Sequence, residues 1–412
     1  MSDKILIHNI ADLVTLSPLV KAQRFAKIEE SDLGRLKQAW IAIEDQKILE
    51  FGTQEPPHQY ASFRRIDAKN SLVLPGLVDC HTHPIFGGNR SHEFAKRLQG
   101  ATYQDIAKAG GGIQYTVAQT KSASDSELLE LLLDRLQIFL SNGVTTVEAK
   151  SGYGLVLEEE IRLLQILNEA KTKAAQDLSI TALALHATHS SFPSAHLQAA
   201  FMTKKLLPRL LSDKLATCVD AFVENGYFSV EDVDEFMMRA GDAGLGIRVH
   251  ADEFGHSGGG YAAAKWGAWS ADHLEHTPVG AIKEMAKNRV VAVLLPGTSV
   301  YSKIPFAKAG PFVENGCPVA LSTDYNPGSS RIENLNFIAS LGALHCGLTL
   351  AQAIAAVTWV PAFSLRQHGR KGAVEKGFDA DLVFHRYATA EDWIAGFGQH
   401  KPWKVICKGR EF

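Results

Sequence analysis

The chain has 412 residues, is 46% hydrophobic and carries a formal net charge of −3. This length suits one (β/α)8 barrel with an attached lobe as well as two or three average domains, and the apolar share allows a large core. The charge provides no basic face, which argues against a nucleic-acid partner. No apolar run could span a bilayer and the N-terminus lacks signal-peptide features, so we expect a cytoplasmic protein without a membrane partner.

The five cysteines are scattered and form no Cys-x-x-Cys pair. This usage argues against a disulfide framework and for a reducing compartment. Cys80 directly precedes His81, which suggests a metal ligand at first sight. Because neighbouring side chains of a strand point to opposite faces, a small buried apolar role is favoured for Cys80.

The two ends of the chain share a β-like pattern of short apolar runs near Gly-containing turns, and the N-terminal pair of runs indicates a hairpin. These runs are residues 39–43, 47–52, 380–384 and 403–407. We therefore predict a composite, β-sandwich-like lobe of residues 1–70 and 375–412, and a barrel domain of residues 71–374.

The middle of the chain alternates between short apolar runs and amphipathic stretches such as residues 125–140, 158–170 and 230–243. This alternation is typical of βαβ units around a parallel sheet. The eight predicted strands are residues 72–81, 144–149, 180–186, 219–223, 246–250, 270–274, 290–295 and 319–323. Eight such units predict an α/β fold of the (β/α)8, TIM-like type. A doubly wound open sheet is the alternative, but no Gly-x-Gly-x-x-Gly motif supports it.

Polar residues gather where the predicted strands stop. The first run ends in His81-Thr82-His83, and alternation along a strand would place both imidazoles on one face, able to share an ion. The fifth, sixth and eighth runs end in RVHADE at 248–253, ADHLEH at 271–276 and STDYN at 322–326. Because barrel enzymes build their active sites at the C-terminal ends of the strands, these groups are expected to converge.

Three imidazoles and one carboxylate, with a position left for water, form a hydrolytic metal site. The metal lowers the pKa of its water to about 7, and a neighbouring Asp or Glu can move the proton. A lone His-x-His pair would be weak support for such a site. Its position at a strand end, together with three further polar strand ends, predicts a metal centre.

Three motifs resemble the amidohydrolase superfamily: PGLVDCHTH at 75–83, GVTTV at 143–147 and GFDADLV at 377–383. Within it, the chain resembles the imidazolonepropionase family over nearly its whole length. The stretches that carry this closer resemblance are residues 81–94, 148–154, 249–254 and 322–329. The resemblance implies hydrolysis of 4-imidazolone-5-propanoate to N-formimino-L-glutamate in histidine breakdown, by a homodimer.

The resemblance also implies a metal-binding set. His81, His83, His250 and Asp324 would hold one Zn²⁺ or Fe³⁺ ion per chain, and both metals suit nitrogen and oxygen ligands. Many relatives bind a second metal through a modified lysine on the fourth strand. Here the fourth predicted strand ends FVENG at 222–226, without a lysine, so one metal per chain is expected.

The substrate of that family has a carboxylate tail and a flat polar ring. Arg90 can pair bidentately with a carboxylate, and Tyr153 lies between two glycines that let its loop approach closely. His186 ends the third run, where a substrate contact and a satisfied core histidine are both open. The resemblance adds three loop residues to the predicted substrate contacts: Asn326, Gly328 and Ser329.

In the predicted mechanism, Asp324 takes the proton of the metal-activated water and His273 polarises the ring carbonyl or stabilises the oxyanion. Glu253 holds the ring N–H or helps to move a proton. The Gly-rich stretches 109–112 and 257–260 lack a Walker ending, and we expect loops that close over the pocket rather than phosphate loops. Two alternatives stay open: a purine or pyrimidine aminohydrolase with the same ligands, and an inactive metal-binding scaffold.

Overall fold

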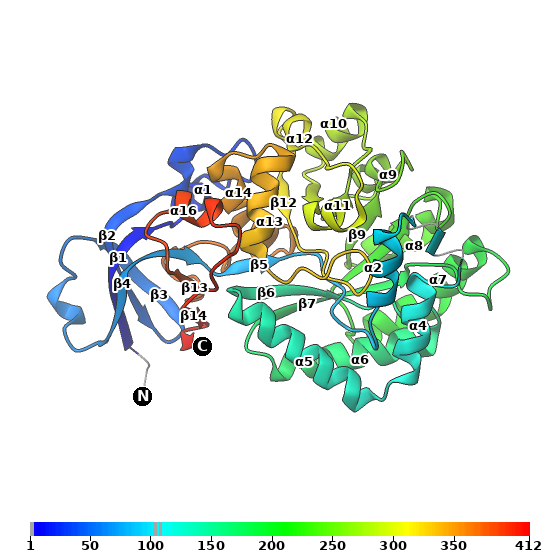
Figure 1. Ribbon diagram of the computed structural model, residues 1–412, viewed down its shortest axis with the longest axis horizontal. Coiled ribbons are helices and arrows are strands. Elements are labelled where there is room, and N and C mark those ends of the chain that lie inside the picture. The colour runs from blue at the N-terminus through cyan, green and yellow to red at the C-terminus, as the bar shows by residue number, and fades with distance from the viewer. Residues whose placement is uncertain (1–3, 102–104, 107–108) are drawn as a thin grey trace.

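The computed structural model describes residues 4–101, 105–106 and 109–412 and contains a barrel sheet and a separate lobe sheet (Figure 1). The barrel strands follow each other in chain order from β5 to β12, and every neighbouring pair is parallel. Their bounds are β5 Leu77–Asp79, β6 Val144–Lys150, β7 Asp177–Leu185, β8 Cys218–Val223, β9 Gly246–Ala251, β10 Ser270–His273, β11 Val291–Leu294 and β12 Val319–Leu321. A parallel bridge between Thr82 and Tyr325 joins the segments that follow β5 and β12. The (β/α)8 prediction is confirmed, and the open-sheet alternative is wrong.

Helices follow most barrel strands and surround the sheet in Figure 1. The described helices of the α type are α1 Ser17–Ala22, α2 Ser91–Leu98, α4 Ile113–Ser122, α5 Asp125–Ser141, α6 Leu157–Lys173, α7 Ala195–Ser212, α8 Val230–Asp242, α9 Gly259–Lys265, α10 Val279–Lys287, α11 Pro296–Ser302, α12 Ala309–Glu314, α13 Leu335–Leu341, α14 Leu350–Ala355, α15 Trp359–Ser364 and α16 Ala390–Ala395. Serine side chains cap α5, α7 and α8 by accepting a backbone N–H of the first turn. Across the described residues, no helix is both long and apolar enough to cross a membrane.

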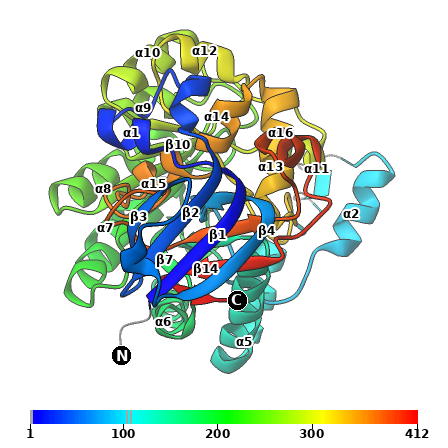
Figure 2. The same ribbon diagram turned by 90° about the vertical axis from the view of Figure 1, so that its left-hand side faces the viewer.

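The lobe sheet combines strands from both ends of the chain, as Figure 2 shows from the lobe side. Its order is β15-β14-β13-β4-β1-β2-β3. The bounds are β1 Lys4–Leu13, β2 Leu36–Glu44, β3 Lys47–Thr53, β4 Arg64–Pro75, β13 Leu382–His385, β14 Lys404–Cys407 and β15 Arg410–Glu411. The expected hairpin is β2–β3, which is antiparallel and turns at Asp45 and Gln46 with positive φ at both. A lobe from both termini is therefore confirmed. The division at residues 70 and 375 stays a proposal, and its residues 1–3 lie outside the described part.

One strand prediction is wrong: residues 72–81 do not form a single barrel strand. The lobe strand β4 ends at Pro75 and the barrel strand β5 begins at Leu77, so the chain changes sheets at Gly76. The Gly76 N–H donates to the carbonyl of Asp381 in the lobe, whereas the Leu77 N–H donates to Gly143 beside the barrel. A Cβ at Gly76 would lie 2.2 Å from Oγ1 of Thr145, so only glycine fits where the lobe meets the barrel.

Candidate metal centre and active site

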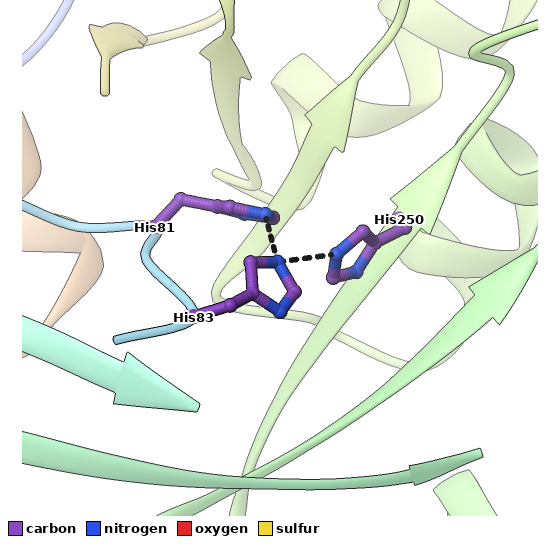
Figure 3. A group of neighbouring side chains, drawn as sticks. All are labelled: His81, His83 and His250. Atoms are coloured by element: carbon purple, nitrogen blue, oxygen red, sulfur yellow. Dashed lines mark hydrogen bonds between the residues drawn. The ribbon is translucent and has the colours of Figure 1, made fainter. Parts of the chain in front are cut away.

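Three imidazoles converge at the C-terminal end of the barrel (Figure 3). His83 Nε2 lies 3.3 Å from Nε2 of His81 and 3.3 Å from Nε2 of His250, and all three rings are buried. His81 and His83 follow β5 rather than lying in it. Their backbones are held instead by the continuation of β12, because the His83 N–H donates to Tyr325 and the His81 carbonyl accepts from Asp324.

Asp324 completes this group from the segment after β12. Its Oδ1 lies 3.5 Å from His81 Nε2 and 3.4 Å from His83 Nε2, and its Oδ2 accepts a hydrogen bond from the Thr298 hydroxyl at 2.5 Å. Asp324 has a φ of 50°, in the left-handed region that non-glycine residues rarely adopt. Strained backbone of this kind persists where the surrounding structure fixes a functional side chain.

Two further carboxylates determine which ring nitrogens face the centre. Asp272 Oδ2 lies 2.6 Å from His81 Nδ1, and Asp220 Oδ1 lies 3.1 Å from His250 Nδ1. Each carboxylate favours a proton on Nδ1, which leaves Nε2 with a lone pair. Burial also lowers the pKa of His81 well below the ordinary histidine value, so this ring is neutral at pH 7. Facing lone pairs repel one another, and a cation between them removes that repulsion.

The spacing of these atoms fits a metal ion. Ligand atoms around a tetrahedral ion with bonds of about 2.0–2.1 Å lie about 3.3–3.4 Å apart, which matches the separations above. The ion would be held by three imidazole nitrogens and one carboxylate oxygen, the donors that both zinc and iron accept. The residues present therefore fit a bound metal, and the four predicted ligands lie together.

His273 and Glu253 lie beside this group, as predicted. His273 Nδ1 is 3.8 Å from Glu253 Oε2, and burial lowers the pKa of His273 to about 3, so this imidazole is a neutral hydrogen-bonding group at pH 7. Burial, together with the nearby carboxylates of Glu275 and Asp324, raises the pKa of Glu253 well above its ordinary value. His273 has a φ of 80°, a second strained position at the site.

A cavity opens onto this group of candidate metal ligands. Its lining includes all of the predicted substrate-contact residues except Gly328, and all of the predicted metal ligands except His81. The predicted residues that line it are Arg90, Tyr153, His186, Asn326, Ser329, His83, His250, Glu253, His273 and Asp324. The sequence predictions for ligands and substrate contacts thus describe one continuous site.

Arg90 is held rigidly at the edge of this cavity. It is only 4% exposed, and its Nε donates to Oε2 of Glu93 at 2.8 Å. Gly328 lies directly against the guanidinium, since a Cβ there would be 2.0 Å from Arg90 Nη1. A fixed, buried guanidinium suits a planar anionic group such as a carboxylate.

His186 has the contact expected of a core histidine and also lines the cavity. Its Nδ1 lies 2.9 Å from the carbonyl oxygen of Gly152, which it satisfies as a core histidine would. The ring also stacks on His83, with centroids 5.3 Å apart, and lines the cavity. With the proton on Nδ1, its Nε2 is an acceptor. Tyr153 lies beside it, with ring centroids 5.4 Å apart.

Asn326 organises the loop after Asp324. Its Oδ1 accepts from the backbone N–H groups of Gly328 and Ser329, at 2.8 and 2.7 Å, and its Nδ2 donates to the carbonyl of Asp324. This is the side-chain bonding of an Asx turn. The amide is therefore engaged within the loop, and the loop places Gly328 against Arg90.

Neither Gly-rich stretch is arranged for phosphate. The N–H of Gly112 donates to Oε1 of Glu93 at 2.9 Å, and the N–H groups of Ser257 and Gly260 donate to the Asp252 carboxylate at 2.8 and 3.3 Å. A carboxylate of the protein already occupies each nest and would repel a second anion. The first stretch thereby connects to Arg90 through Glu93.

The sequence reasoning assigned no role to Asp272, Asp220, Glu148 or Lys150, all of which are buried beneath the histidines. A signal was present in the sequence. Asp220 lies in the middle of an apolar strand, and Glu148 and Lys150 alternate on one face of another. Charged residues inside a barrel strand are costly to bury unless they are paired, so they mark a polar network.

The chain belongs to the amidohydrolase family, because its residues 72–412 match the sequence model of that family. Within the family its curated relatives are imidazolonepropionases. That of Caldanaerobacter subterraneus subsp. tengcongensis is 41% identical, over 100% of this chain and 98% of the relative. That of Bdellovibrio bacteriovorus is 39% identical, over 99% of this chain and 96% of the relative.

Solved structures with lower identity share the fold. A 5-methylcytosine deaminase from Klebsiella pneumoniae has a TM-score of 0.72 at 17% identity, covering 99% of this chain and 97% of its own. A guanine deaminase from C. acetobutylicum has a TM-score of 0.69 at 15% identity, covering 99% of this chain and 100% of its own. At these identities the likeness concerns the barrel and lobe alone.

Proposed function

We propose that this chain is a metal-dependent hydrolase that opens the ring of 4-imidazolone-5-propanoate to N-formimino-L-glutamate, a step of histidine degradation. One observation carries the proposal. A single cavity is lined both by His83, His250 and Asp324 of the candidate metal-binding cluster and by the buried Arg90. A small ring with a carboxylate tail can contact both at once. The near full-length similarity to imidazolonepropionases supports the same substrate.

When bound, the metal would act as a Lewis acid and lower the pKa of a water molecule toward 7. Asp324 lies beside that position and would accept the proton of the attacking water. His273, neutral at pH 7, would donate a hydrogen bond to the ring carbonyl as negative charge develops on its oxygen. Glu253, whose pKa is raised by burial and by neighbouring carboxylates, would contact the ring nitrogen and help to move a proton to it as the C–N bond breaks.

The remaining contacts would orient the substrate. Arg90 would pair with the propanoate carboxylate, and Tyr153 would hydrogen-bond the same group. His186 would accept a hydrogen bond through Nε2, since its Nδ1 faces the Gly152 carbonyl. The loop of Asn326, Gly328 and Ser329 would close around the tail.

We also propose one zinc or iron ion per chain, a homodimeric assembly and a cytoplasmic location. Metal analysis of the purified protein combined with an assay on 4-imidazolone-5-propanoate tests the function directly. Cytosine and guanine are the comparison substrates, because the fold neighbours include deaminases. Turnover of either base in preference to the imidazolone would reject the proposal in favour of an aminohydrolase. Absence of any turnover by metal-loaded protein would favour an inactive scaffold.

A further inference from the structure

Lys150 is a buried cation that the proposed chemistry does not use. It is the last residue of β6, and its side chain is fully buried. Its Nζ lies 2.8 Å from Asp220 Oδ2, 2.9 Å from Glu148 Oε1 and 4.0 Å from Asp272 Oδ2. The Lys150 ammonium group therefore lies within 4.0 Å of three buried carboxylates.

Each of these carboxylates also contacts the metal-binding segments. Asp220 faces Nδ1 of His250 at 3.1 Å, and Asp272 faces Nδ1 of His81 at 2.6 Å. Glu148 Oε2 accepts the N–H of Thr82 at 3.2 Å.

Thr82 lies between His81 and His83, so a single carboxylate separates Lys150 from the His81–His83 segment and from His250. An ammonium that is central to these contacts can fix the orientation of the imidazoles without touching any of them.

The free-energy cost of burying Lys150 and its carboxylates argues against a role in fold stability alone. Burying a charged network costs free energy and is often no more stabilising than well-packed apolar residues. Burial alone lowers the pKa of Lys150, but the Asp220 and Glu148 carboxylates outweigh it and raise that pKa above the ordinary lysine value. Among the described residues, Lys150 is the one lysine or arginine within 4.0 Å of Asp220. Arg248 also lies near two of the carboxylates, 3.7 Å from Asp272 Oδ2 and 3.9 Å from Glu148 Oε1, but it forms no such pair with Asp220. Without Lys150, Asp220 would lose its neighbouring ammonium and turn away from His250.

We propose that Lys150 is a positioning residue of the metal centre: it holds Asp220 and Glu148 in place so that His250 and the His81–His83 segment present Nε2 to the metal. This inference rests on the metal-dependent function proposed above. Loss of partners that orient histidine ligands typically weakens metal binding about 10- to 100-fold.

The test compares Lys150→Met with Lys371→Met. Lys371 is a matched control, because it is also buried among three carboxylates, Asp177, Asp379 and Asp381 at 2.6–2.9 Å, where the lobe meets the start of β7. The Zn²⁺ dissociation constant is measured by competition with a chromophoric chelator. The absorption spectrum of the Co²⁺-loaded protein reports the ligand geometry independently of activity.

We expect the Zn²⁺ dissociation constant to rise at least about tenfold in Lys150→Met, with an altered Co²⁺ spectrum, and to stay within about twofold of the parent in Lys371→Met. Equal weakening in both variants, or unchanged affinity in a folded Lys150→Met variant, overturns the proposal. If Lys150→Met does not fold, Glu148→Gln, which keeps the side-chain shape, is measured against the same criteria. Suppose that Lys150→Met binds Zn²⁺ at least about tenfold more weakly than the parent, but the parent does not turn over 4-imidazolone-5-propanoate. This result rejects the proposed substrate and still supports the role of Lys150.

Discussion

Replacing Gly328 by alanine should displace the carboxylate anchor while leaving the metal-binding residues in place. The added Cβ would lie 2.0 Å from Nη1, 2.2 Å from Cζ and 2.7 Å from Nη2 of Arg90. Gly328 is not among the positive-φ glycines, so its backbone does not itself demand glycine, and the three atoms nearest to the added Cβ all belong to the guanidinium. Contacts of a Cβ below 3.0 Å essentially do not occur, so the guanidinium must retreat by about 1 Å.

The loss of activity caused by this displacement of Arg90 can be estimated. Glu93 Oε2 accepts a hydrogen bond from Arg90 Nε at 2.8 Å, so a displaced guanidinium would also strain this contact. A misplacement of about 1 Å in a group that positions substrate can cost about 10²-fold. A charge-assisted hydrogen bond contributes about 1.5–3 kcal/mol, which corresponds to about 10- to 150-fold in binding. We therefore expect kcat/KM to fall about 10- to 100-fold, mainly through KM.

Steady-state kinetics on 4-imidazolone-5-propanoate measures this effect. Gly310→Ala is the matched control, since a Cβ at that position meets nothing within 4 Å. A substrate analogue without the carboxylate tail should be turned over equally by the Gly328→Ala variant and the parent. If Gly328→Ala retains the parent KM for the acid-tailed substrate, Arg90 is not the carboxylate anchor.

Three further predictions concern the metal centre and the lobe. Asp324→Ala should lower kcat by at least about 10³-fold without changing the circular dichroism spectrum. The substitution removes both the proposed metal ligand and the proposed proton acceptor. Near-normal activity would contradict the proton-acceptor role. Removing the metal with a chelator should abolish turnover and lower the melting temperature. The reason is that a ligand at 100 times its Kd stabilises the folded state by about 2.7 kcal/mol. Full activity after verified metal removal would refute metal dependence. Burial would raise the pKa of Asp177, but Lys371 and Arg370 outweigh it and lower that pKa to about 2, below the unfolded value. This stabilisation is therefore present above about pH 4 and is lost as the pH falls through about 2. Urea denaturation should show Asp177→Asn less stable than the parent by about 1–2 kcal/mol at pH 6 and by less than about 0.5 kcal/mol near pH 2. A pH-independent difference would refute the assignment.

The convergence of the candidate metal ligands could be predicted from the sequence because it depends on little beyond topology. His81, His83, His250 and Asp324 each follow a barrel strand, and the C-terminal ends of parallel strands meet at one end of any such barrel. These residues converge even where the predicted strand ends are wrong. His81 and His83 lie outside β5, yet His83 Nε2 still lies 3.3 Å from Nε2 of both His81 and His250.

The partners of these residues could not be predicted in the same way. Glu93 holds Arg90 through a contact within one short helix turn, but the local sequence does not show that both side chains are buried. Lys150 meets Asp220 across 70 positions of sequence, and which carboxylate it meets depends on strand register and side-chain rotamers. The exchange of sheets at Gly76 depends on Thr145 and Asp381, which come close only after the lobe has packed on the barrel.

The position of β4 in the lobe has a consequence for how the chain is made. β4 pairs with β1 on one side and with β13 on the other, and β13 begins at Leu382, near the end of the chain. A nascent chain emerging from the ribosome therefore presents β4 with one unpaired edge throughout the synthesis of the whole barrel. Open strand edges pair readily with other chains, so stalled or C-terminally truncated products are expected to aggregate even where their barrel has formed.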